Sequence, residues 1–354
     1  KLASLVKQGK VDEALIHDAA SRILKVKFEL GLFDDPYKYC DEAREASVIG
    51  SETNQSSVLD LAKKSIVLLK NQNNVLPLAK KGQKIAVIGA LASDKTSPLG
   101  NWRLAADINS AVSLLEGLQA YSGNTITYAK GADVVIGKTG FVSELTINTT
   151  DTSGFREAIT LAKKSDVVIM ALGEHAMHSG EGRSRAYLGL PGVQQELLEA
   201  VFAVNKNIVL VLSNGRPLTI PWAAQNIPTI LEGWHLGTQS GNALAQVLYG
   251  DYNPSGKLPM SFPRSLGQLP LYYNYKNTGR PSPVKPGQVF WTHYIDQKNT
   301  PQYPFGFGLS YTTFSYSKPM VVHTYSIDKQ VTVKVKVSNT GKREGKETVQ
   351  LYLR

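Results

Sequence analysis

Strand-like runs rich in aliphatic residues alternate with amphipathic segments from about residue 57 onward. The strand-like runs, each bounded by polar or turn-forming residues, occupy residues 65–71, 84–90, 124–131, 166–174, 207–215 and 228–235. Apolar residues spaced three and four apart predict helices over residues 58–65, 111–121, 155–165, 191–204 and 240–250. Strands that are almost solidly Val, Ile and Leu are typical of a parallel sheet covered on both faces. The pattern therefore predicts an α/β domain with a mainly parallel sheet over residues 57–265.

A separate helix is predicted before this domain, over residues 11–30. Its apolar stripe consists of Leu15, Ile16, Ala19, Ala20, Ile23 and Leu24. Gly31 is a natural stop for this helix, and the turn-forming Asp34, Asp35 and Pro36 follow it. Residues 40–56 are polar, and we expect a linker or an exposed helix there.

The pattern changes again toward the C-terminus. Residues 251–310 combine many Pro, Gly and Tyr with little periodicity, so we expect an irregular but ordered connection over 266–310. After residue 311 the chain alternates, with valines at 331, 333, 335 and 337 on one face and Lys334 and Lys336 on the other. Residues 339–345 read as a turn. This alternation predicts half of an antiparallel sandwich, which is not stable alone.

Composition narrows the class of protein. A chain of 354 residues with 42% hydrophobic and 19% charged residues is not disordered and is long enough for two or three domains. The longest apolar runs, such as 208–212, are too short to span a bilayer. Cys40 is the single cysteine, which excludes an intrachain disulfide. The net charge of +10 is spread along the chain, so we expect a solvated surface and no nucleic-acid partner.

The two ends of the sequence have no natural boundary. The chain begins with Lys1 inside what reads as the end of another domain, and it stops within the alternating run 347–354. We therefore expect a fragment that is truncated at both ends. The lack of a signal peptide consequently says nothing about the compartment.

The loop after the predicted strand 166–174 carries most of the candidate chemistry. Its charged residues and histidines are Glu174, His175, His178, Glu181, Arg183 and Arg185. Glu181 stands between Gly180 and Gly182, which allow a loop to move a carboxyl group into a cleft, where desolvation raises its pKa. The alternative is a solvated loop in which Glu181 pairs with Arg183 or Arg185. The residues alone favour that alternative, because structural ion pairs outnumber catalytic carboxylates.

Other kinds of site have less support. The histidines and glutamates of this loop lack H-E-x-x-H spacing, so we expect no metal. No phosphate-cradling glycine motif and no G-x-S-x-G elbow occur, so we expect no cofactor and no esterase. Cys40 has no histidine nearby in sequence and is not expected to act as a nucleophile. For each loop aromatic, we favour packing over sugar stacking at Trp102, Trp234, Tyr272, Tyr273, Trp291 and Tyr294.

Several long stretches resemble a known family. They are AKKSIVLLKNQNNVLPL at 62–78, IAVIGALASDKTSPLGNW at 85–102, SGEGRSRAYLGLPGVQQELLEAV at 179–201, IVLVLSNGRPL at 208–218, the run 241–281 and YPFGFGLSYTTFSYS at 303–317. Together they span nearly the whole chain. The sequence resembles the C-terminal part of family 3 glycoside hydrolases, most of all their periplasmic bacterial β-glucosidases.

The resemblance implies three domains in the full enzyme. A (β/α)₈-type barrel would precede this chain, and residues 1–39 would be its remnant, ending in a tail helix. Residues 40–56 would be a linker, and residues 57–265 an α/β sandwich domain. Residues 311–354 would be the start of an all-β fibronectin type III-like domain.

The resemblance also implies an activity, the hydrolysis of terminal non-reducing β-D-glucosyl residues with retention. The family's nucleophile is a barrel Asp in a Ser-Asp-Trp-like context, which neither Asp94 nor Asp166 matches, so we expect it outside this chain. The family's acid/base position falls on Glu181, which reverses the preference stated above. Glu174 would hold the loop and Arg185 would tether it. Further substrate-binding candidates are His178, Arg183, Arg185 and Trp291.

Three alternatives stay open beside a β-glucosidase. A β-xylosidase of the same family is one, and a β-N-acetylhexosaminidase, whose acid/base usually lies on the barrel, is disfavoured by Glu181. A non-catalytic sugar-binding or scaffold fragment is the third. The expected partners are a β-linked glucoside or oligosaccharide and the missing barrel domain, with no membrane span. The resemblance implies a periplasmic or secreted protein, and we expect the isolated chain to be inactive.

Overall fold

The computed structural model describes residues 1–103, 106–283, 285, 287–321 and 331–353. The chain divides into two compact units, residues 1–55 and 56–354. The first unit contains α1 (Leu2–Lys7), α2 (Glu13–Glu29), α3 (Glu42–Val48) and the start of α4 (Glu52–Ser65). The predicted helix over 11–30 is therefore confirmed as α2. None of residues 1–55 is buried, so this unit has no hydrophobic core of its own.

Helix α2 is bounded by standard capping residues. The Asp12 side chain accepts a hydrogen bond from the Ala14 N–H at 2.9 Å, which satisfies one of the free donors at the helix start. Gly31 follows the helix with a φ of +74°, in the left-handed region that favours glycine. The apolar stripe of α2 is exposed, with Leu15 at 65% and Ile23 at 61%.

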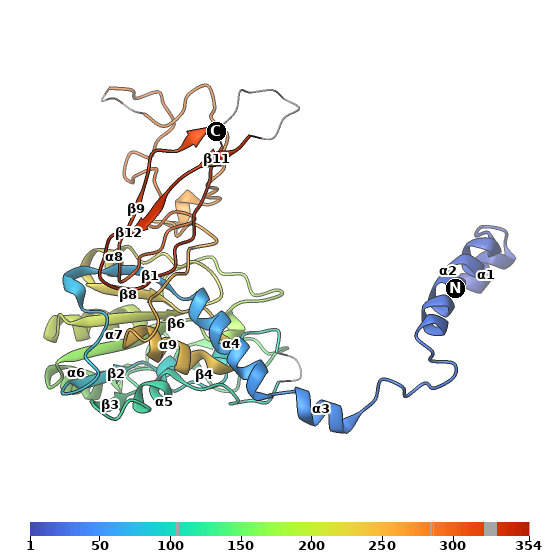
Figure 1. Cartoon of the computed structure of the whole chain (residues 1–354), viewed down its shortest axis with the longest axis horizontal. Helices are drawn as coiled ribbons and strands as arrows, with labels where there is room; N and C mark the ends of the chain where they lie inside the picture. Colours follow the sequence, from blue (N-terminus) through green and yellow to red (C-terminus); the bar gives the residue numbers. More distant parts are fainter. Residues whose placement is uncertain (104–105, 284, 286, 322–330, 354) are drawn as a thin grey trace. The chain divides into compact units, whose positions relative to one another are not determined.

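The second unit is built on a six-stranded sheet (Figure 1). In spatial order its strands are β1 (Val67–Asn71), β8 (Thr229–Glu232), β7 (Ile208–Ser213), β6 (Val167–Gly173), β2 (Lys84–Ile88) and β3 (Thr125–Ala129). The five strands from β8 to β3 are parallel, which confirms the predicted mainly parallel sheet. The edge strand β1 runs antiparallel to β8. An aliphatic run has the same composition in either direction, so the sequence pattern does not reveal this reversal.

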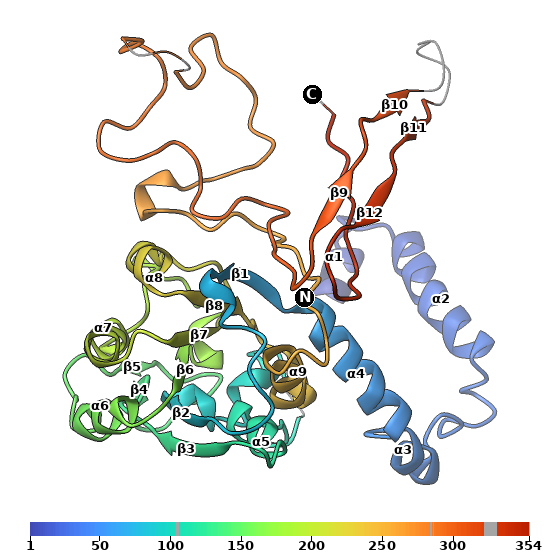
Figure 2. The same cartoon turned by 60° about the vertical axis from the view of Figure 1, so that its left-hand side comes forward.

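Helices cover both faces of the sheet, as Figure 2 shows. One layer contains α4, α5 (Leu114–Gln119) and α9 (Ser240–Leu248), and the other contains α6 (Phe155–Lys163), α7 (Gln194–Val204) and α8 (Pro221–Asn226). Successive strand residues enter opposite cores, as Ile85 and Val87 do on one side and Ala86 and Ile88 on the other. The central strands are buried on both faces because each face has its own helical layer.

Several short elements were not predicted. These are the small ladder of β4 (Val135–Ile136) with β5 (Thr146–Ile147), and the 3₁₀ turns η1 (Gln72–Asn74), η2 (Ala90–Ala92), η3 (Ser97–Leu99), η4 (Ala176–His178), η5 (Gly237–Gln239) and η6 (Leu266–Gln268). Among the described residues of 251–310, η6 is the only helical or strand element, as expected for an irregular connection. Phe262 and Tyr303 are buried and anchor this connection, with the Phe262 N–H donating to the Tyr303 carbonyl at 2.8 Å.

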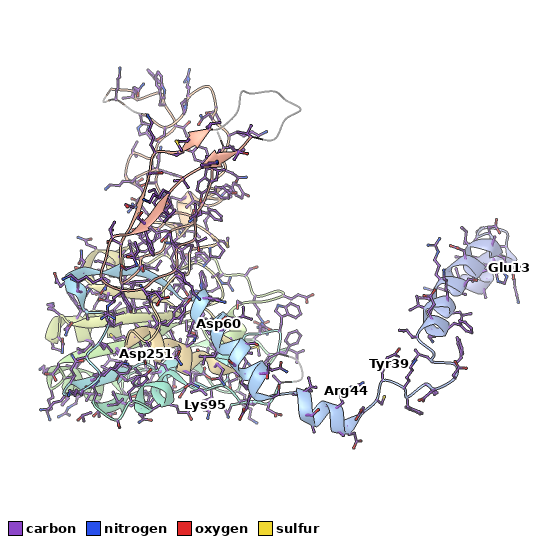
Figure 3. The ribbon with its side chains drawn as sticks, viewed as in Figure 1. Glu13, Tyr39, Arg44, Asp60, Lys95 and Asp251 are labelled. Carbon is purple, nitrogen blue, oxygen red and sulfur yellow. The ribbon has the colours of Figure 1, made fainter. Side chains whose placement is uncertain are left out.

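Surface ion pairs lie between elements of the second unit, and Figure 3 labels one member of each of two such pairs, Lys95 and Asp251. Lys95 contacts Glu116 of α5 at 2.8 Å, and Lys80 contacts Asp251 after α9. Tyr121 also donates its hydroxyl to Asp251 at 2.5 Å. Exposed pairs of this kind contribute little to stability, so the two buried cores remain the main source of folding free energy.

The C-terminal part consists of two antiparallel ladders. Strand β9 (Phe314–Tyr316) pairs with β12 (Val337–Asn339), and β10 (Met320–Val321) pairs with β11 (Val333–Lys334). Within the alternating segment, residues 333–334 and 337–339 are strand, so the prediction of strand is confirmed for these residues. The described residues after the turn, 346–353, form no strand, so alternation wrongly indicated strand pairing there. Alternation specifies a face but not a partner. A fibronectin type III-like domain stays a prediction.

Candidate functional site

The candidate residues meet at the carboxyl edge of the parallel sheet. The connection after β2 leads to β3 on one side, whereas the connection after β6 leads to β7 on the other side. Where connections diverge in this way, the loops leave a crevice in which α/β proteins bind ligands. The Asn101 side chain, which follows β2, donates to the Ser179 carbonyl in the loop that follows β6. The two loops that flank the crevice are thus joined by a hydrogen bond.

The start of the loop after β6 is fixed by a close approach to β7. Gly173 lies opposite Ser213 and has a φ of +142°. A Cβ atom there would stand 2.1 Å from the Ser213 carbonyl oxygen, so the position requires glycine. The buried Gln194 amide accepts from the Gly173 N–H at 2.9 Å and donates to the Gly173 carbonyl at 2.8 Å. Strand β6 therefore ends in a rigid position.

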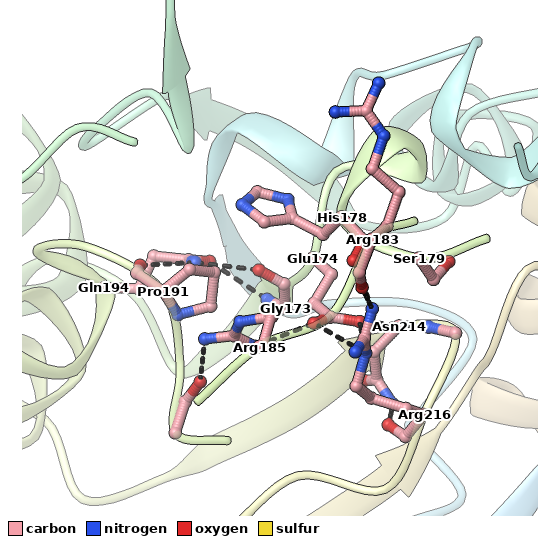
Figure 4. A network of polar contacts seen from close by, with 12 residues as sticks. Gly173, Glu174, His178, Ser179, Arg183, Arg185, Pro191, Gln194, Asn214 and Arg216 are labelled. Atoms are coloured by element: carbon pink, nitrogen blue, oxygen red, sulfur yellow. Dashed lines mark hydrogen bonds and ion pairs between the residues drawn. The ribbon is translucent and has the colours of Figure 1, made fainter. Parts of the chain in front are cut away.

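Glu174 is a fully buried carboxylate with two arginine partners (Figure 4). Arg185 Nη1 lies 2.7 Å from its Oε1, and Arg216 Nε lies 3.3 Å from the carboxylate. The Gly215 N–H completes its coordination at 3.4 Å. Arg185 also donates to the Gly189 carbonyl at 2.9 Å. These are the contacts expected of a loop-holding glutamate and a loop-tethering arginine, and neither group faces solvent freely.

Arg216 was missed by the sequence analysis. Its Nη2 donates to the backbone carbonyl of His178 and, at 2.8 Å, to that of Arg183. It lies in the loop after β7, and the sequence pattern assigns no role to it. Only the pairing of β6 with β7 brings it beside Glu174.

Glu181 is exposed at the tip of the loop after β6. Within the described part of the chain it makes no hydrogen bond and no ion pair. Arg183 donates to the carbonyls of Phe141 at 2.8 Å and Ser143 at 2.9 Å, and Arg185 is bound to Glu174. The alternative in which Glu181 pairs with Arg183 or Arg185 is therefore wrong. Its carboxyl group is exposed to solvent.

His178 is buried, whereas His175 of the same loop and the nearby His235 are partly buried. His178 is 4% exposed, and neither of its ring nitrogens has a hydrogen-bond partner among the described residues. Burial lowers the pKa of His178 to about 4, with Glu174 acting in the opposite direction. Burial likewise lowers the pKa of His235 to about 4. Both rings are thus neutral near neutral pH, and little of the His178 side chain is exposed.

A second buried carboxyl group, Glu232, lies at the end of β8. It accepts hydrogen bonds from the Trp234 N–H at 3.0 Å and from Asn214 Nδ2 at 3.2 Å. Burial raises the pKa of Glu232 to about 8, against these two hydrogen bonds, and the neighbouring Glu174 raises it further. In the sequence, Glu232 is hidden in an aliphatic strand, and no pattern distinguishes it.

Four of the loop aromatics that we expected to pack are exposed, although Trp102 and Tyr273 each contact another ring, Tyr273 stacking on Phe305 at 4.1 Å. Trp102 is 62% exposed and meets the Phe141 ring edge to face at 6.1 Å. Tyr272, Tyr273 and Tyr294 are also exposed, whereas Trp234 packs partly against the core. Trp102 directly follows Asn101, so it belongs to the connection after β2 that is bonded to the loop of Glu181.

The remaining aromatic candidate is Trp291. It is half-buried in the connection 266–310. No hydrogen bond or ring contact among the described residues joins Trp291 to the loop of Glu181. Trp291 therefore has no contact of these two kinds with the other candidates within the described structure.

The described residues offer no ready metal or membrane site. No group of three or more His, Cys, Asp or Glu among them is arranged to hold a metal ion. Their helices also lack the length and apolar character that crossing a bilayer would require. The chemistry of the edge is that of carboxylates and arginines.

Comparison with known proteins assigns this arrangement to a family. The profile of the glycosyl hydrolase family 3 C-terminal domain matches residues 66–311. A periplasmic β-glucosidase of Salmonella typhimurium is 43% identical over 99% of this chain and 48% of the relative. A β-xylosidase of Formosa agariphila is also 43% identical, over 96% of this chain and 45% of the relative.

Solved structures agree with the sequence relatives. The β-glucosidase of Listeria innocua, in complex with isofagomine, superposes with a TM-score of 0.86 at 33% identity, over 96% of this chain and 45% of that one. The chain thus spans about half the length of the relatives it matches. It belongs to glycoside hydrolase family 3 and corresponds to the C-terminal part of these enzymes.

Proposed function

We propose that this chain is the part of a retaining β-glucosidase that supplies the general acid/base, Glu181. Its substrate would be a terminal non-reducing β-D-glucosyl residue. The nucleophile would be an Asp on an N-terminal barrel domain that is not part of this chain. One observation carries the proposal: Glu181 is exposed and unpaired in the described structure, at the crevice of the sheet, while every arginine of its own loop is engaged elsewhere.

The proposed reaction has two steps. The barrel Asp attacks the anomeric carbon while Glu181 gives its proton to the glycosidic oxygen, so that the C–O bond breaks and the leaving group departs as an alcohol. Glu181, now a carboxylate, then takes a proton from water, whose oxygen attacks the anomeric carbon and releases the sugar and the Asp. Retaining enzymes hold the two carboxyl groups about 5–5.5 Å apart.

The surroundings of Glu181 suit this exchange of a proton. In the first step the carboxyl group must carry the proton that it gives to the glycosidic oxygen. Its exposed position leaves it accessible to a sugar and to water, the two groups with which it would exchange that proton. Glu174 and Glu232 are already buried in the fold, so neither can reach a substrate in this structure.

Glu181→Gln in the full-length enzyme tests the proposal. Loss of a proton-transfer group typically costs about 10²–10⁴ in rate. We expect a loss of that size on methyl β-D-glucoside or cellobiose, whose leaving groups need protonation. Dinitrophenyl β-D-glucoside needs no proton for departure, so its first step should be affected much less. An equal loss on both substrates would contradict the acid role.

Azide rescue gives an independent test. In a Glu181→Ala variant, azide can enter the space of the lost carboxylate and attack the glycosyl-enzyme without base assistance. We expect faster turnover of dinitrophenyl β-D-glucoside and formation of β-glucosyl azide. Glu196→Gln, an exposed change on α7, is the matched control and should show neither effect. Absence of the azide product would count against Glu181.

A β-xylosidase is the second candidate function, because the Formosa relative is as similar in identity as the Salmonella enzyme. The two sugars differ by one hydroxymethyl group. The ratio of kcat/KM on aryl β-D-glucoside and aryl β-D-xyloside separates the candidates. We expect a higher kcat/KM on the glucoside. A higher kcat/KM on the xyloside would change the proposed substrate and leave the acid/base assignment of Glu181 as it is.

The compartment is also part of the proposal. The periplasmic Salmonella relative supports a periplasmic or secreted location. Fractionation of the native cells, followed by detection of the protein with an antibody against this chain, would test it. Recovery with the cytoplasmic fraction would contradict it.

A further inference from the structure

The Arg216 guanidinium connects three parts of the crevice edge. Its Nε contacts the buried Glu174 carboxylate at 3.3 Å, and its Nη2 donates to the carbonyls of His178 and Arg183. These two carbonyls stand three residues before and two residues after Glu181. A single nitrogen atom, Nη2 of Arg216, therefore binds both ends of segment 178–183, which carries Glu181 (Figure 4).

We propose that Arg216 is the positioning residue of the acid/base Glu181. This inference rests on the proposed function of Glu181. Arg216 lies outside the loop it holds, on the connection after β7, so it ties the loop to the rigid sheet. It acts through the backbone and has no contact with Glu181 itself among the described residues.

The two glycines beside Glu181 explain why its loop needs a positioning residue. Gly180 has a φ of +110° and Gly182 a φ of +68°, so the residues beside Glu181 have the widest conformational freedom. An untethered loop of this kind would place the carboxyl group in many positions. Because the His178 and Arg183 carbonyls accept hydrogen bonds from the same donor, the two ends of segment 178–183 are held close together. This limits the positions that Glu181 can take. General acid catalysis needs this accuracy, because a misplacement of about 1 Å can cost 10²-fold in rate.

Arginine suits this position and lysine does not. The planar guanidinium presents Nε and Nη2 in fixed directions, so it can bind a carboxylate and two carbonyls at once. The ammonium of a lysine is a point charge with a different reach. Arg216 is 21% exposed and Glu174 fully buried, so the ion pair keeps the guanidinium in place. Arg216→Lys thus retains the charge beside Glu174 but loses the hydrogen bonds to the His178 and Arg183 carbonyls.

The test is a double-mutant cycle in the full-length enzyme. We expect Arg216→Lys to lower kcat/KM on methyl β-D-glucoside by about 10²-fold. On dinitrophenyl β-D-glucoside, which needs no proton for departure, we expect a change within about threefold in the first step. In a Glu181→Gln background, Arg216→Lys should add almost no further loss on either substrate. If Arg216 had a purely structural role, Arg216→Lys would instead lower kcat/KM on both substrates alike, in the native and in the Glu181→Gln background.

Controls separate this inference from the proposed function and from misfolding. If Glu181→Gln lacks the leaving-group dependence, the proposed function fails. If Glu181→Gln shows it and Arg216→Lys does not, only the positioning role fails. Arg264→Lys is the matched control, because Arg264 also donates to a backbone carbonyl, that of Thr300 at 2.8 Å, away from this loop. Arg264→Lys should leave kcat/KM on both substrates unchanged.

A second variant covers the case in which Arg216→Lys does not fold. Arg216→Gln removes the guanidinium and its hydrogen bonds to the two carbonyls, while Glu174 keeps its ion pair with Arg185 at 2.7 Å, so the buried carboxylate is not left unpaired. We expect the same leaving-group dependence from this variant. Hydrogen exchange of the peptide 175–190 should rise in both variants while that of β6 and β7 stays constant. Unchanged exchange at 175–190 would overturn the proposal.

Discussion

At the scale of single residues, the carboxyl group of Glu232 links protonation to stability. Its pKa is raised by burial to about 8, from an ordinary value of 4.5. Between these two values the unfolded chain has lost this proton while the folded chain keeps it. The unfolded state binds fewer protons, so the free energy of unfolding falls as pH rises, by up to ~1.4 kcal/mol per pH unit from this group. Above about pH 8 this contribution becomes constant.

Glu232→Gln should remove this trend. The expected result is a stability difference between the native protein and the variant that is largest near pH 5 and shrinks steadily up to about pH 8. Urea unfolding of the isolated chain at several pH values measures it. Glu196→Gln, an exposed carboxyl-to-amide change, should keep the native trend. A difference that grows with pH would contradict a protonated Glu232.

The two glycines beside Glu181 should differ in their tolerance of a side chain. A Cβ at Gly180 would stand 2.5 Å from Asn101 Nδ2, whereas a Cβ at Gly182 would meet nothing within 4 Å. Both positions strain alanine, but Gly180→Ala also displaces the Asn101 side chain that holds Ser179. We expect about 3 kcal/mol of destabilisation for Gly180→Ala and about 1 kcal/mol for Gly182→Ala. Urea unfolding of the two variants gives the comparison, and equal losses would contradict the role of Asn101.

At the scale of elements, α5 begins with a complete capping box. The Ser113 hydroxyl accepts from the Glu116 N–H at 3.2 Å, and the Glu116 carboxylate accepts from the Ser113 N–H at 2.8 Å. Ser113→Ala should lower the free energy of unfolding by about 1 kcal/mol. Thermal or urea unfolding measures it. Ser122→Ala, in the exposed turn after α5, should stay within about 0.5 kcal/mol of the native protein.

The elements of the α/β domain could be predicted because their patterns are local. A buried strand such as β6 must be aliphatic at every position, and a covering helix such as α6 must present apolar residues at helical spacing. Strand direction is a property of the connections, so the antiparallel edge strand β1 could not be recognised from its own residues. The partner of an alternating strand is equally non-local, which is why β12 pairs with β9 and not with the residues after its turn.

The candidate site was predictable only in part, for the same reason. Glu181 stands out because two glycines flank it, and glycine carries a local signal. The engagement of Arg183 with Phe141 and Ser143, and of Arg216 with His178, depends on which loops the sheet brings together. Sequence spacing alone made an ion pair of Glu181 with Arg183 the simpler expectation. The positions of Arg216 and Glu232 follow from the pairing of β7 with its neighbours.

At the scale of the whole molecule, the proposed hydrolysis with retention would need a second carboxylate that faces the sugar opposite Glu181. Glu174 is buried between Arg185 and Arg216, and Glu232 is buried at the end of β8. Asp94 accepts hydrogen bonds from the backbone N–H groups of Thr96 and Ser97. The carboxylates near the crevice are therefore committed to structure, which agrees with a nucleophile supplied by another domain.

The isolated 354-residue chain should accordingly have no glucosidase turnover, even on dinitrophenyl β-D-glucoside, because an acid/base without a nucleophile cannot form the glycosyl-enzyme. Joining the chain to the N-terminal half of the Salmonella relative should restore turnover that depends on Glu181. A Glu181→Gln version of the isolated chain is the control, since any activity that survives this change comes from a contaminating enzyme. Turnover by the isolated chain that disappears with Glu181→Gln would mean that one of its own carboxylates acts as the nucleophile.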